Sequence, residues 1–180
     1  MVSGPGGVGK GTVVDELRRL RDDVVVSVSA TTRPPRPGEV DGVHYHFLED
    51  EAFDALVAED GLLEWATFGG HRYGTPWSSV LAELDAGRVV VLEIEVQGAL
   101  QVRERFHDAL LVLLCPPDEA ALVERLRERG TDSDARIAER VEIGRWEQAQ
   151  SHRFDHIIIN DDVTAAAAAI ASILDDAPVS

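Results

Sequence analysis

The chain alternates short apolar runs with longer segments in which apolar residues recur every three or four positions. Runs rich in valine and isoleucine predict β-strands, and segments of helical period predict amphipathic helices. The expected strands cover residues 24–30, 43–48, 62–68, 89–95, 109–115 and 156–160. The expected helices cover residues 12–21, 49–60, 77–86, 96–106, 118–129 and 134–150, and the alanine-rich segment that follows Asp161 and Asp162.

This order predicts an α/β fold, because strands separated by helical crossovers form a parallel sheet flanked by helices. The 180 residues are the length of one domain. Between residues 31 and 80 the strands are short and closely spaced, so a small antiparallel or mixed lobe is expected on the main sheet. Thr75 and Pro76 are expected to cap and open the helix at residues 77–86.

The charge of the chain limits its partners. The formal net charge is −16, and an acidic surface repels nucleic-acid backbones and anionic membranes. The single cysteine, Cys115, ends an apolar run and is expected to be buried in a protein of a reducing compartment. The apolar stretches are too short for a membrane span, and the chain does not open on a signal segment. The sequence therefore predicts a cytoplasmic protein without a nucleic-acid or membrane partner.

Lys10 is the only lysine, whereas the chain has sixteen arginines. Glycines let successive backbone N–H groups point at phosphate oxygens, and the start of the following helix adds partial positive charge. A compact ammonium fits inside such a loop better than a planar guanidinium does. An apolar residue before the loop and an amphipathic helix after it favour a nucleoside triphosphate site over a surface turn. The loop consists of Gly4, Pro5, Gly6, Gly7, Val8, Gly9, Lys10, Gly11 and Thr12.

Gly11 occupies the position where a serine or threonine usually ligates magnesium in such loops. Thr12 has the nearest hydroxyl and is the candidate to replace it. The Gly-Lys-Gly-Thr sequence is similar to that of nucleoside monophosphate kinases of the adenylate kinase type, so the departure is expected to be tolerated.

A second group of polar residues follows in the predicted lobe. Arg33 and Arg36 lie three residues apart in a proline-rich loop, and Tyr45 follows nine residues after Arg36. Arginine forks match phosphate oxygens, and a phenol adds one more donor. Glu64 can accept hydrogen bonds from adjacent ring N–H and amino donors, which guanine has and adenine lacks. These residues together predict a site for a small phosphorylated ligand.

With these motifs the chain resembles the guanylate kinase family, and the matching segments are spread over nearly its whole length. The resemblance implies a P-loop NTPase-type parallel sheet, a GMP-binding lobe with a small mixed sheet, and a helical lid. It also implies transfer of phosphate from ATP to GMP or dGMP in purine nucleotide metabolism. The implied division is a core at about 1–30, 81–125 and 146–180, a lobe at 31–80 and a lid at 126–145. The matching segments are residues 4–12, 29–47, 64–66, 73–75, 92–98, 125–131, 137–140 and 158–162.

The resemblance implies a role for each matching residue. The residues implied to hold ATP are those of the loop at 4–12, with Arg125 and Asn160. The residues implied to hold GMP are Ser29, Arg33, Arg36, Tyr45, Glu64, Tyr73, Thr75 and Glu95. The residues implied to stabilise the transferring phosphoryl group are Lys10, Arg33, Arg129 and Arg140. Mg²⁺ is the implied cofactor, and its candidate ligands, directly or through water, are Thr12 and Glu93.

Glu93 and Glu95 depart from the family, which usually has aspartate at both positions. Alternation along a strand puts both carboxylates on one face, toward the site. Each side chain is one methylene longer than aspartate, so its reach to a magnesium-bound water or to the guanine amino group changes. The alternative is a pair of charges that are merely solvated at the end of a strand.

Two other functions use parts of the same pattern. A P-loop kinase for another phosphorylated acceptor, such as a ribose bisphosphate, would not need the guanine-binding residues Ser29, Glu64 and Thr75. A non-catalytic interaction module of guanylate-kinase type would have an impaired phosphate loop, whereas Lys10 is retained here. His44 and His46 share a strand face without a third ligand, so a zinc site is not expected.

Only three residues precede Gly4, whereas strands in globular proteins are usually about five or six residues long. Three residues span roughly 10 Å at about 3.3 Å per residue. We expect the natural chain to begin upstream. The alternative is a complete protein that accepts a short first strand.

Overall fold

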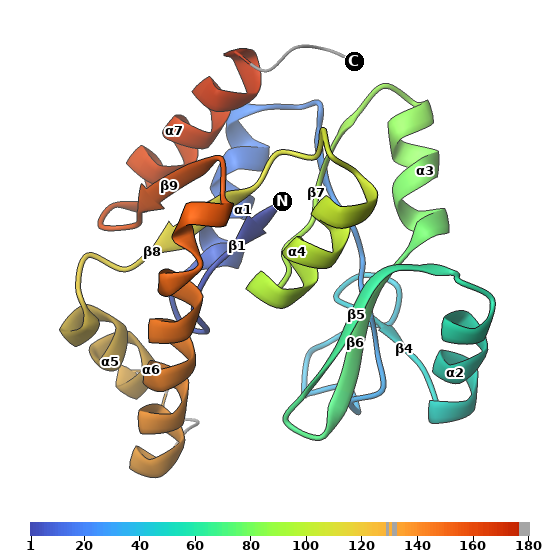
Figure 1. The fold of residues 1–180 in the computed structure, drawn as a ribbon, viewed down its shortest axis with the longest axis horizontal. Helices are drawn as coiled ribbons and strands as arrows, with labels where there is room; N and C mark the ends of the chain where they lie inside the picture. The colour runs from blue at the N-terminus through green and yellow to red at the C-terminus, as the bar shows by residue number, and fades with distance from the viewer. Residues whose placement is uncertain (129, 131–132, 177–180) are drawn as a thin grey trace.

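The computed structural model describes residues 1–128, 130 and 133–176. Its main sheet consists of parallel strands, in the predicted α/β arrangement (Figure 1). Two groups of paired strands are joined by a parallel bridge between Val2 and Glu93. The order across the sheet is β2 (Val24–Val26), β7 (Val89–Val91), β1 (Val2–Ser3), β8 (Val112–Cys115) and β9 (His156–Ile159).

Helices cover both faces of this sheet because its strands are apolar on both sides. One face is covered by α1 (Lys10–Leu20) and α7 (Val163–Asp176), and the other by α3 (Trp77–Asp85) and α4 (Val96–Arg105). Val112 and Leu114 of β8 pack on the side of α1 and α7. Leu113 and Cys115 pack on the side of α3 and α4. This alternation is the period of two that a strand buried on both faces requires.

A second sheet forms a smaller lobe at the lower right of Figure 1. β3 (Ala30–Thr31) pairs parallel with β4 (His46–Phe47) and antiparallel with β6 (His71–Pro76), so the sheet is mixed, as the sequence predicts. Helix α2 (Asp50–Ala58) packs on it and buries Phe53 against Ala30 and Leu62. The order of its strands is β4 (His46–Phe47), β3 (Ala30–Thr31), β6 (His71–Pro76) and β5 (Leu62–Phe68).

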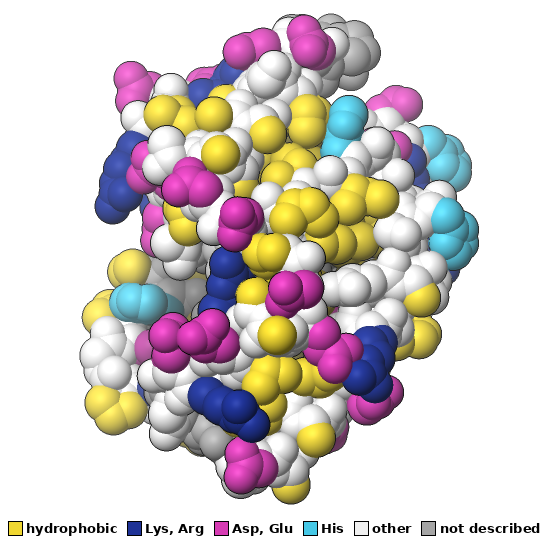
Figure 2. Space-filling view, turned by 90° about the vertical axis from the view of Figure 1, so that its left-hand side faces the viewer, with side chains coloured by type: hydrophobic (Ala, Val, Ile, Leu, Met, Phe, Trp, Pro, Cys, Tyr) yellow, Lys and Arg dark blue, Asp and Glu magenta, His cyan; other side chains and the backbone are white. Residues whose placement is uncertain are grey.

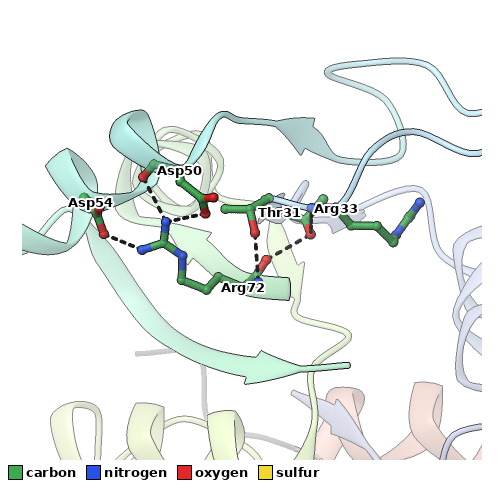
Figure 3. A network of polar contacts seen from close by, with 6 residues as sticks. Thr31, Arg33, Asp50, Asp54 and Arg72 are labelled. Carbon is green, nitrogen blue, oxygen red and sulfur yellow. Dashed lines mark hydrogen bonds and ion pairs between the residues drawn. The ribbon is translucent and has the colours of Figure 1, made fainter. Parts of the chain in front are cut away.

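Arg72 of β6 connects the parts of this lobe (Figure 3). Its guanidinium binds Asp54 and, at 2.7 Å, the Oδ1 atom of Asp50, both in α2. Its carbonyl accepts a hydrogen bond from the Thr31 hydroxyl at 2.9 Å, and the same hydroxyl oxygen accepts the Arg33 N–H at 3.1 Å. The network therefore fixes the direction in which the chain leaves β3. The side chain of Arg33 points away from Arg72 (Figure 3).

Helices α5 (Glu119–Glu128) and α6 (Asp134–Ala149) form a pair at the lower left of Figure 1. They pack through Leu122 and Leu126 of α5 and through Ile137 and Val141 of α6. The short 3₁₀ helix η1 (Ser151–Arg153) then leads into β9. Within the described ranges, no helix is long and apolar enough to span a membrane.

The predicted strand at residues 24–30 is wrong in one respect, because it forms two strands that belong to different sheets. β2 ends at Val26 in the main sheet, and β3 begins at Ala30 in the lobe. A continuous strand-like run does not reveal such a change of sheet, because the local pattern gives no sign of where one strand ends and the next begins. The strands expected at 43–48 and 89–95 are also shorter in the structure.

The segment before α3 is a strand, which the sequence pattern did not predict. β6 pairs antiparallel with β5 across the turn at Gly69 and Gly70. The prediction that Thr75 caps the helix is wrong, because its hydroxyl donates to Glu64 instead. Pro76 is the last residue of β6 and precedes the first helical residue.

Gly4→Ala is expected to lower the stability of the fold by about 2–4 kcal/mol. Gly4 has a φ of 144°, and a Cβ atom there would lie 2.1 Å from the carbonyl oxygen of Leu114 in β8. Urea unfolding measures the change. Gly87→Ala is the matched control, because Gly87 has a φ of 73° but no atom within 4 Å of the added Cβ. Its expected cost is about 1 kcal/mol, and equal costs for the two variants would contradict the steric argument.

Candidate functional site

One cleft, with a volume of about 370 Å³, lies between the glycine-rich loop and the lobe. It gathers predicted site residues that are far apart in the sequence. Those that line it are Pro5, Gly6, Gly7, Gly9, Lys10, Gly11, Ser29, Arg33, Arg36, Tyr45, Glu64, Tyr73, Glu93 and Glu95. The loop and the lobe therefore form two sides of a single site.

The glycine-rich loop has a backbone that suits phosphate. Gly4, Gly7 and Gly9 have φ values of 144°, 101° and 96°, which residues with a side chain rarely adopt. Helix α1 begins directly after them at Lys10, so its first N–H groups and its partial positive charge face the loop. The Nζ atom of Lys10 donates to the carbonyl oxygen of Gly4 at 2.6 Å. The ammonium therefore lies across the loop.

Two side chains from distant segments hold this loop in place. Asn160 Nδ2 donates to the carbonyl oxygen of Val8 at 2.7 Å, and Arg125 Nη1 donates to the same oxygen at 3.1 Å. Arg125 Nη2 also donates to the carbonyl oxygen of Asn160 at 2.8 Å. These contacts attach the loop to α5 and to the end of β9. Direct binding of ATP by Arg125 and Asn160 stays a prediction.

Helix α6 brings a further cation to the loop. A Cβ atom on Gly6 would lie 3.0 Å from Nη1 of Arg140, so this guanidinium lies directly against the loop. About one turn later, a Cβ atom on Gly144 would lie 3.3 Å from the side chain of Pro5. The helix and the loop are therefore in close contact. Arg129, the other cation predicted for this region, lies outside the described residues.

Arg33 and two tyrosines meet on the lobe side of the cleft. The Arg33 guanidinium lies 5.5 Å from the ring centroid of Tyr45 and 5.8 Å from that of Phe47. The rings of Tyr45 and Tyr73 are 6.1 Å apart. With Arg36, which also lines the cleft, these side chains offer two forked cations and two phenols. Such a set matches the oxygens of a phosphate group.

Glu64 forms the buried end of the cleft and is only 6% exposed. The Thr75 hydroxyl donates to its Oε1 atom at 2.7 Å. A Cβ atom on Gly98 would lie 2.6 Å from its Oε2 atom, so the carboxylate needs a glycine there. Burial raises the pKa of Glu64, and the hydrogen bonds from Thr75 act in the opposite direction. A fixed, partly desolvated carboxylate of this kind suits the N–H donors of a base.

Glu93 and Glu95 line the cleft and are exposed, whereas Ile94 between them also borders the cleft but is buried, as the alternation predicts. A Cβ atom on Gly11 would lie 3.4 Å from Oε2 of Glu93. Carboxylate oxygens suit Mg²⁺, so Glu93 fits this ion beside the loop. Thr12 is exposed on α1 and is not among the residues that line the cleft. Across the described ranges, no group of three potential ligand side chains could hold a metal by itself. A magnesium ion here would therefore depend on the phosphates of its ligand.

Glu147 of α6 belongs to this region, although the sequence pattern did not single it out. It is 2% exposed and continues the buried helix face of Ile137, Val141 and Gly144. Burial and the Glu95 carboxyl raise the pKa of Glu147 to about 8, and the charge of Lys10 acts in the opposite direction. A glutamate on an otherwise apolar helix face was the available signal, because such residues are seldom buried without a partner.

The outer surface carries a different distribution of charge. Figure 2 shows acidic side chains scattered among apolar ones on one face, with few basic side chains between them. The cleft also contains the glutamates at positions 39, 64, 93 and 95, but it brings the cations Lys10, Arg33 and Arg36 together. Phosphate binding in this acidic chain is therefore favoured inside the cleft.

Comparisons with known proteins agree with this geometry. A family model described as guanylate kinase matches residues 1–177. A guanylate kinase of Thermobifida fusca is 56% identical over 163 residues, which cover 91% of this chain and 83% of that protein. One of Gloeobacter violaceus is 51% identical over 174 residues, which cover 97% of this chain and 85% of that protein. The crystal structure of guanylate kinase from Anaplasma phagocytophilum matches with a TM-score of 0.76 at 29% identity, covering 97% of this chain and 82% of that one.

Glu147 makes the stability of the fold depend on pH. Its pKa is about 8 in the folded chain, against an ordinary value of 4.5, so the folded state keeps a proton that the unfolded state has lost. Its contribution to stability therefore falls as pH rises from about 4.5 to about 8, and is constant above that range. Glu147→Gln carries no such proton, so its melting temperature should rise by several degrees relative to the parent chain between pH 5 and pH 8.

Thermal unfolding followed by circular dichroism at several pH values measures this difference. Glu139→Gln is the control, because Glu139 is exposed on the same helix. A constant difference between Glu147→Gln and the parent chain across this pH range would contradict the account.

Proposed function

The chain belongs to the guanylate kinase family, and from this membership we propose how its cleft carries out the reaction. The enzyme phosphorylates GMP to GDP and uses ATP. We assign one substrate to each side of the cleft, with the core at residues 1–30, 81–125 and 146–180, the GMP lobe at 31–80 and the lid at 126–145. The observation that carries this proposal is that the glycine-rich loop and the proline-rich loop with Arg33 and Arg36, here called the arginine loop, meet in one cleft.

ATP binds on the side of the glycine-rich loop. Its outer phosphates replace the Gly4 carbonyl as the partner of the Lys10 ammonium, which lies across the loop. The backbone N–H groups of the loop and the start of α1 stabilise the same phosphates. Arg140 contributes charge from α6, where its guanidinium lies against Gly6. We keep Arg129 in the same role as a proposal from the family resemblance.

GMP binds on the side of the lobe. Its phosphate is held by Arg33 and Arg36 with the phenols of Tyr45 and Tyr73, which meet there. Its guanine lies at the buried end. The residues proposed to recognise the guanine there by hydrogen bonds are Ser29, Glu64, Thr75 and Glu95. Glu64 is suited to adjacent N–H donors because its carboxylate is fixed by the Thr75 hydroxyl and by contact with Gly98.

The protein need not form a covalent intermediate in this reaction. A phosphate oxygen of GMP attacks the γ-phosphorus of ATP, and the leaving group is ADP. The transition state is loose and spreads its charge over the equatorial oxygens, so positioning and electrostatics carry the catalysis. Lys10 stabilises this charge from the ATP side and Arg33 from the GMP side. When bound with ATP, Mg²⁺ neutralises further phosphate charge, and Glu93 is the residue that fits it best.

Closure of the lobe and the α5–α6 pair over the substrates would exclude water, which could otherwise take the place of GMP and hydrolyse ATP. Two further features of the proposal rest on the resemblance. The enzyme is placed in the cytoplasm, where its nucleotide substrates are made and used. It accepts dGMP in addition to GMP.

Turnover of ATP with a panel of nucleoside monophosphates tests the proposed function. GMP should be phosphorylated efficiently and dGMP less so, whereas AMP, CMP and UMP should be nearly inert. A site built to bind N–H donors can reject a base without them by about 10⁴-fold. Equal kcat/KM for AMP and GMP would overturn the guanine-binding role of Glu64. Activity with a ribose bisphosphate but not with GMP would favour the other kinase function.

Glu64→Gln is expected to raise the KM for GMP by about tenfold or more and to narrow the preference for GMP over AMP. The amide retains the shape of the carboxylate but replaces one acceptor oxygen by a donor that faces the N–H groups of guanine. Steady-state kinetics with both nucleotides measures the effect. Glu59→Gln removes an exposed acid at the end of α2 and should leave both constants unchanged. An unaltered GMP preference in Glu64→Gln would refute the assignment.

Lys10→Arg is expected to reduce kcat/KM by about 10²-fold or more while the fold is retained. A branched, planar cation cannot take the place of the ammonium inside the glycine-rich loop. Coupled-enzyme assays measure activity, and thermal unfolding checks the fold. Arg18→Lys is the control, because it exchanges the same two residue types at an exposed position of α1. Kinetics like those of the parent chain in Lys10→Arg would show that a compact charge is not required.

A further inference from the structure

Glu39 lines the phosphate end of the GMP site, and the family-derived roles above leave it without one. Both of its carboxylate oxygens are bound by the arginine loop. Oε1 accepts a hydrogen bond from Nη2 of Arg33 at 2.9 Å, and Oε2 accepts one from the backbone N–H of Arg36 at 2.6 Å. The backbone N–H of Glu39 donates to the carbonyl of Arg36 at 3.0 Å. One residue thus connects the guanidinium of one phosphate ligand with the backbone of the other.

The ion pair between Arg33 and Glu39 is largely shielded from water. The two side chains are 11% and 17% exposed, and the rings of Tyr45 and Phe47 flank the guanidinium. The Nη1 atom of Arg33 donates in addition to the carbonyl of Pro34 at 2.7 Å. An arginine side chain has many rotamers in water. These contacts restrict Arg33 to one of them before any ligand arrives.

By charge alone, Glu39 is an unfavourable neighbour for a phosphate. The hydrogen bond and charge of Arg33 hold the pKa of the Glu39 carboxyl below its ordinary value, so this group is negative at neutral pH. A negative carboxylate repels the dianion of GMP. A carboxylate at this position can still favour phosphate binding if it orders Arg33 and Arg36, because side chains that are ordered before binding lose less entropy when the ligand binds.

We propose that Glu39 is a positioning residue for GMP, which holds Arg33 and Arg36 in the arrangement that binds the phosphate. The proposal rests on the proposed function, since it takes the GMP phosphate as the ligand of both arginines. Nη2 of Arg33 stays on Glu39, and other N–H groups of the fork turn to the phosphate. Loss of the carboxylate frees the guanidinium. Removal of the Glu39 carboxylate should therefore weaken binding of GMP and leave binding of guanosine unchanged.

Calorimetric titration of the full chain with GMP and with guanosine separates this role from a general loss of structure. Glu39→Gln should weaken GMP binding by about tenfold or more, because the charge-assisted hydrogen bond that orders Arg33 is lost. Guanosine has no phosphate for Arg33 to bind, so its affinity should change by less than about twofold. Glu51→Gln removes the same charge at an exposed position of α2 in the same lobe. This control should bind both ligands like the parent chain.

Two results with Glu39→Gln would overturn the proposal. An equal fall in the affinities for GMP and guanosine would mean that Glu39 only supports the fold of the lobe. Unchanged or tighter binding of GMP would mean that Glu39 competes with phosphate for Arg33. If the parent chain itself bound GMP no better than guanosine, the phosphate site and the role of Glu39 would both be overturned. If the parent chain binds GMP more tightly than guanosine, the proposed phosphate site stands, and the result with Glu39→Gln then tests the role of Glu39 alone.

A second pair of variants tests whether Glu39 acts through Arg33. In an Arg33→Met chain, Glu39 has no guanidinium to hold. The hydrogen bond from the Arg36 N–H remains and can be accepted by glutamine as well, so Glu39→Gln removes only the repulsion of phosphate. Arg33→Met with Glu39→Gln should then bind GMP at least as tightly as Arg33→Met alone. Such a reversal of sign between the two backgrounds is a coupling that a double-mutant cycle measures directly. A further weakening as large as that in the parent background would refute the action through Arg33.

Discussion

Phosphate binding in this chain depends on gathering a few cations in one place, because the protein as a whole carries a net charge of −16. The glycine-rich loop meets this requirement with backbone N–H groups, the start of α1 and Lys10. Much of the fold holds this loop in place. Gly4 leaves room for the carbonyl of Leu114 in the neighbouring strand β8, and the carbonyl of Val8 is bound by Asn160 from the end of β9. The main sheet and the site therefore depend on each other.

The acidic side chains of the cleft differ in what holds them. Glu64 is fixed by the Thr75 hydroxyl and is the acceptor proposed for guanine. Glu39 is bound to Arg33, so that in our account its charge orders a cation. Glu147 lies buried behind the cleft, and its raised pKa keeps it protonated at neutral pH. Each of these three carboxyl groups is therefore either hydrogen-bonded or protonated, which limits its repulsion of a phosphate.

Much of the site could be predicted from the sequence because its groups lie in continuous segments. The loop at residues 4–12 and the arginine loop each contain, within one short segment, the residue types that bind phosphate. The amphipathic helices have a clear period of apolar residues. The pairing of β6 with β5 could not be read in the same way, because a strand in a hairpin depends on its partner. The contacts of Glu39 and the burial of Glu147 also depend on tertiary packing, which places each of them against a particular charged neighbour.

In the proposed function, the cleft passes a phosphoryl group directly from ATP to GMP. A ³¹P NMR time course of the full chain with ATP, Mg²⁺ and GMP tests it most directly, because nucleoside mono-, di- and triphosphates and inorganic phosphate have separate resonances. The ATP and GMP signals should fall by equal amounts from the start, and two nucleoside diphosphates should form for each ATP lost, while the inorganic phosphate signal stays at the level of a sample without protein. Growth of inorganic phosphate in step with ADP, with GMP unchanged, would contradict the claim.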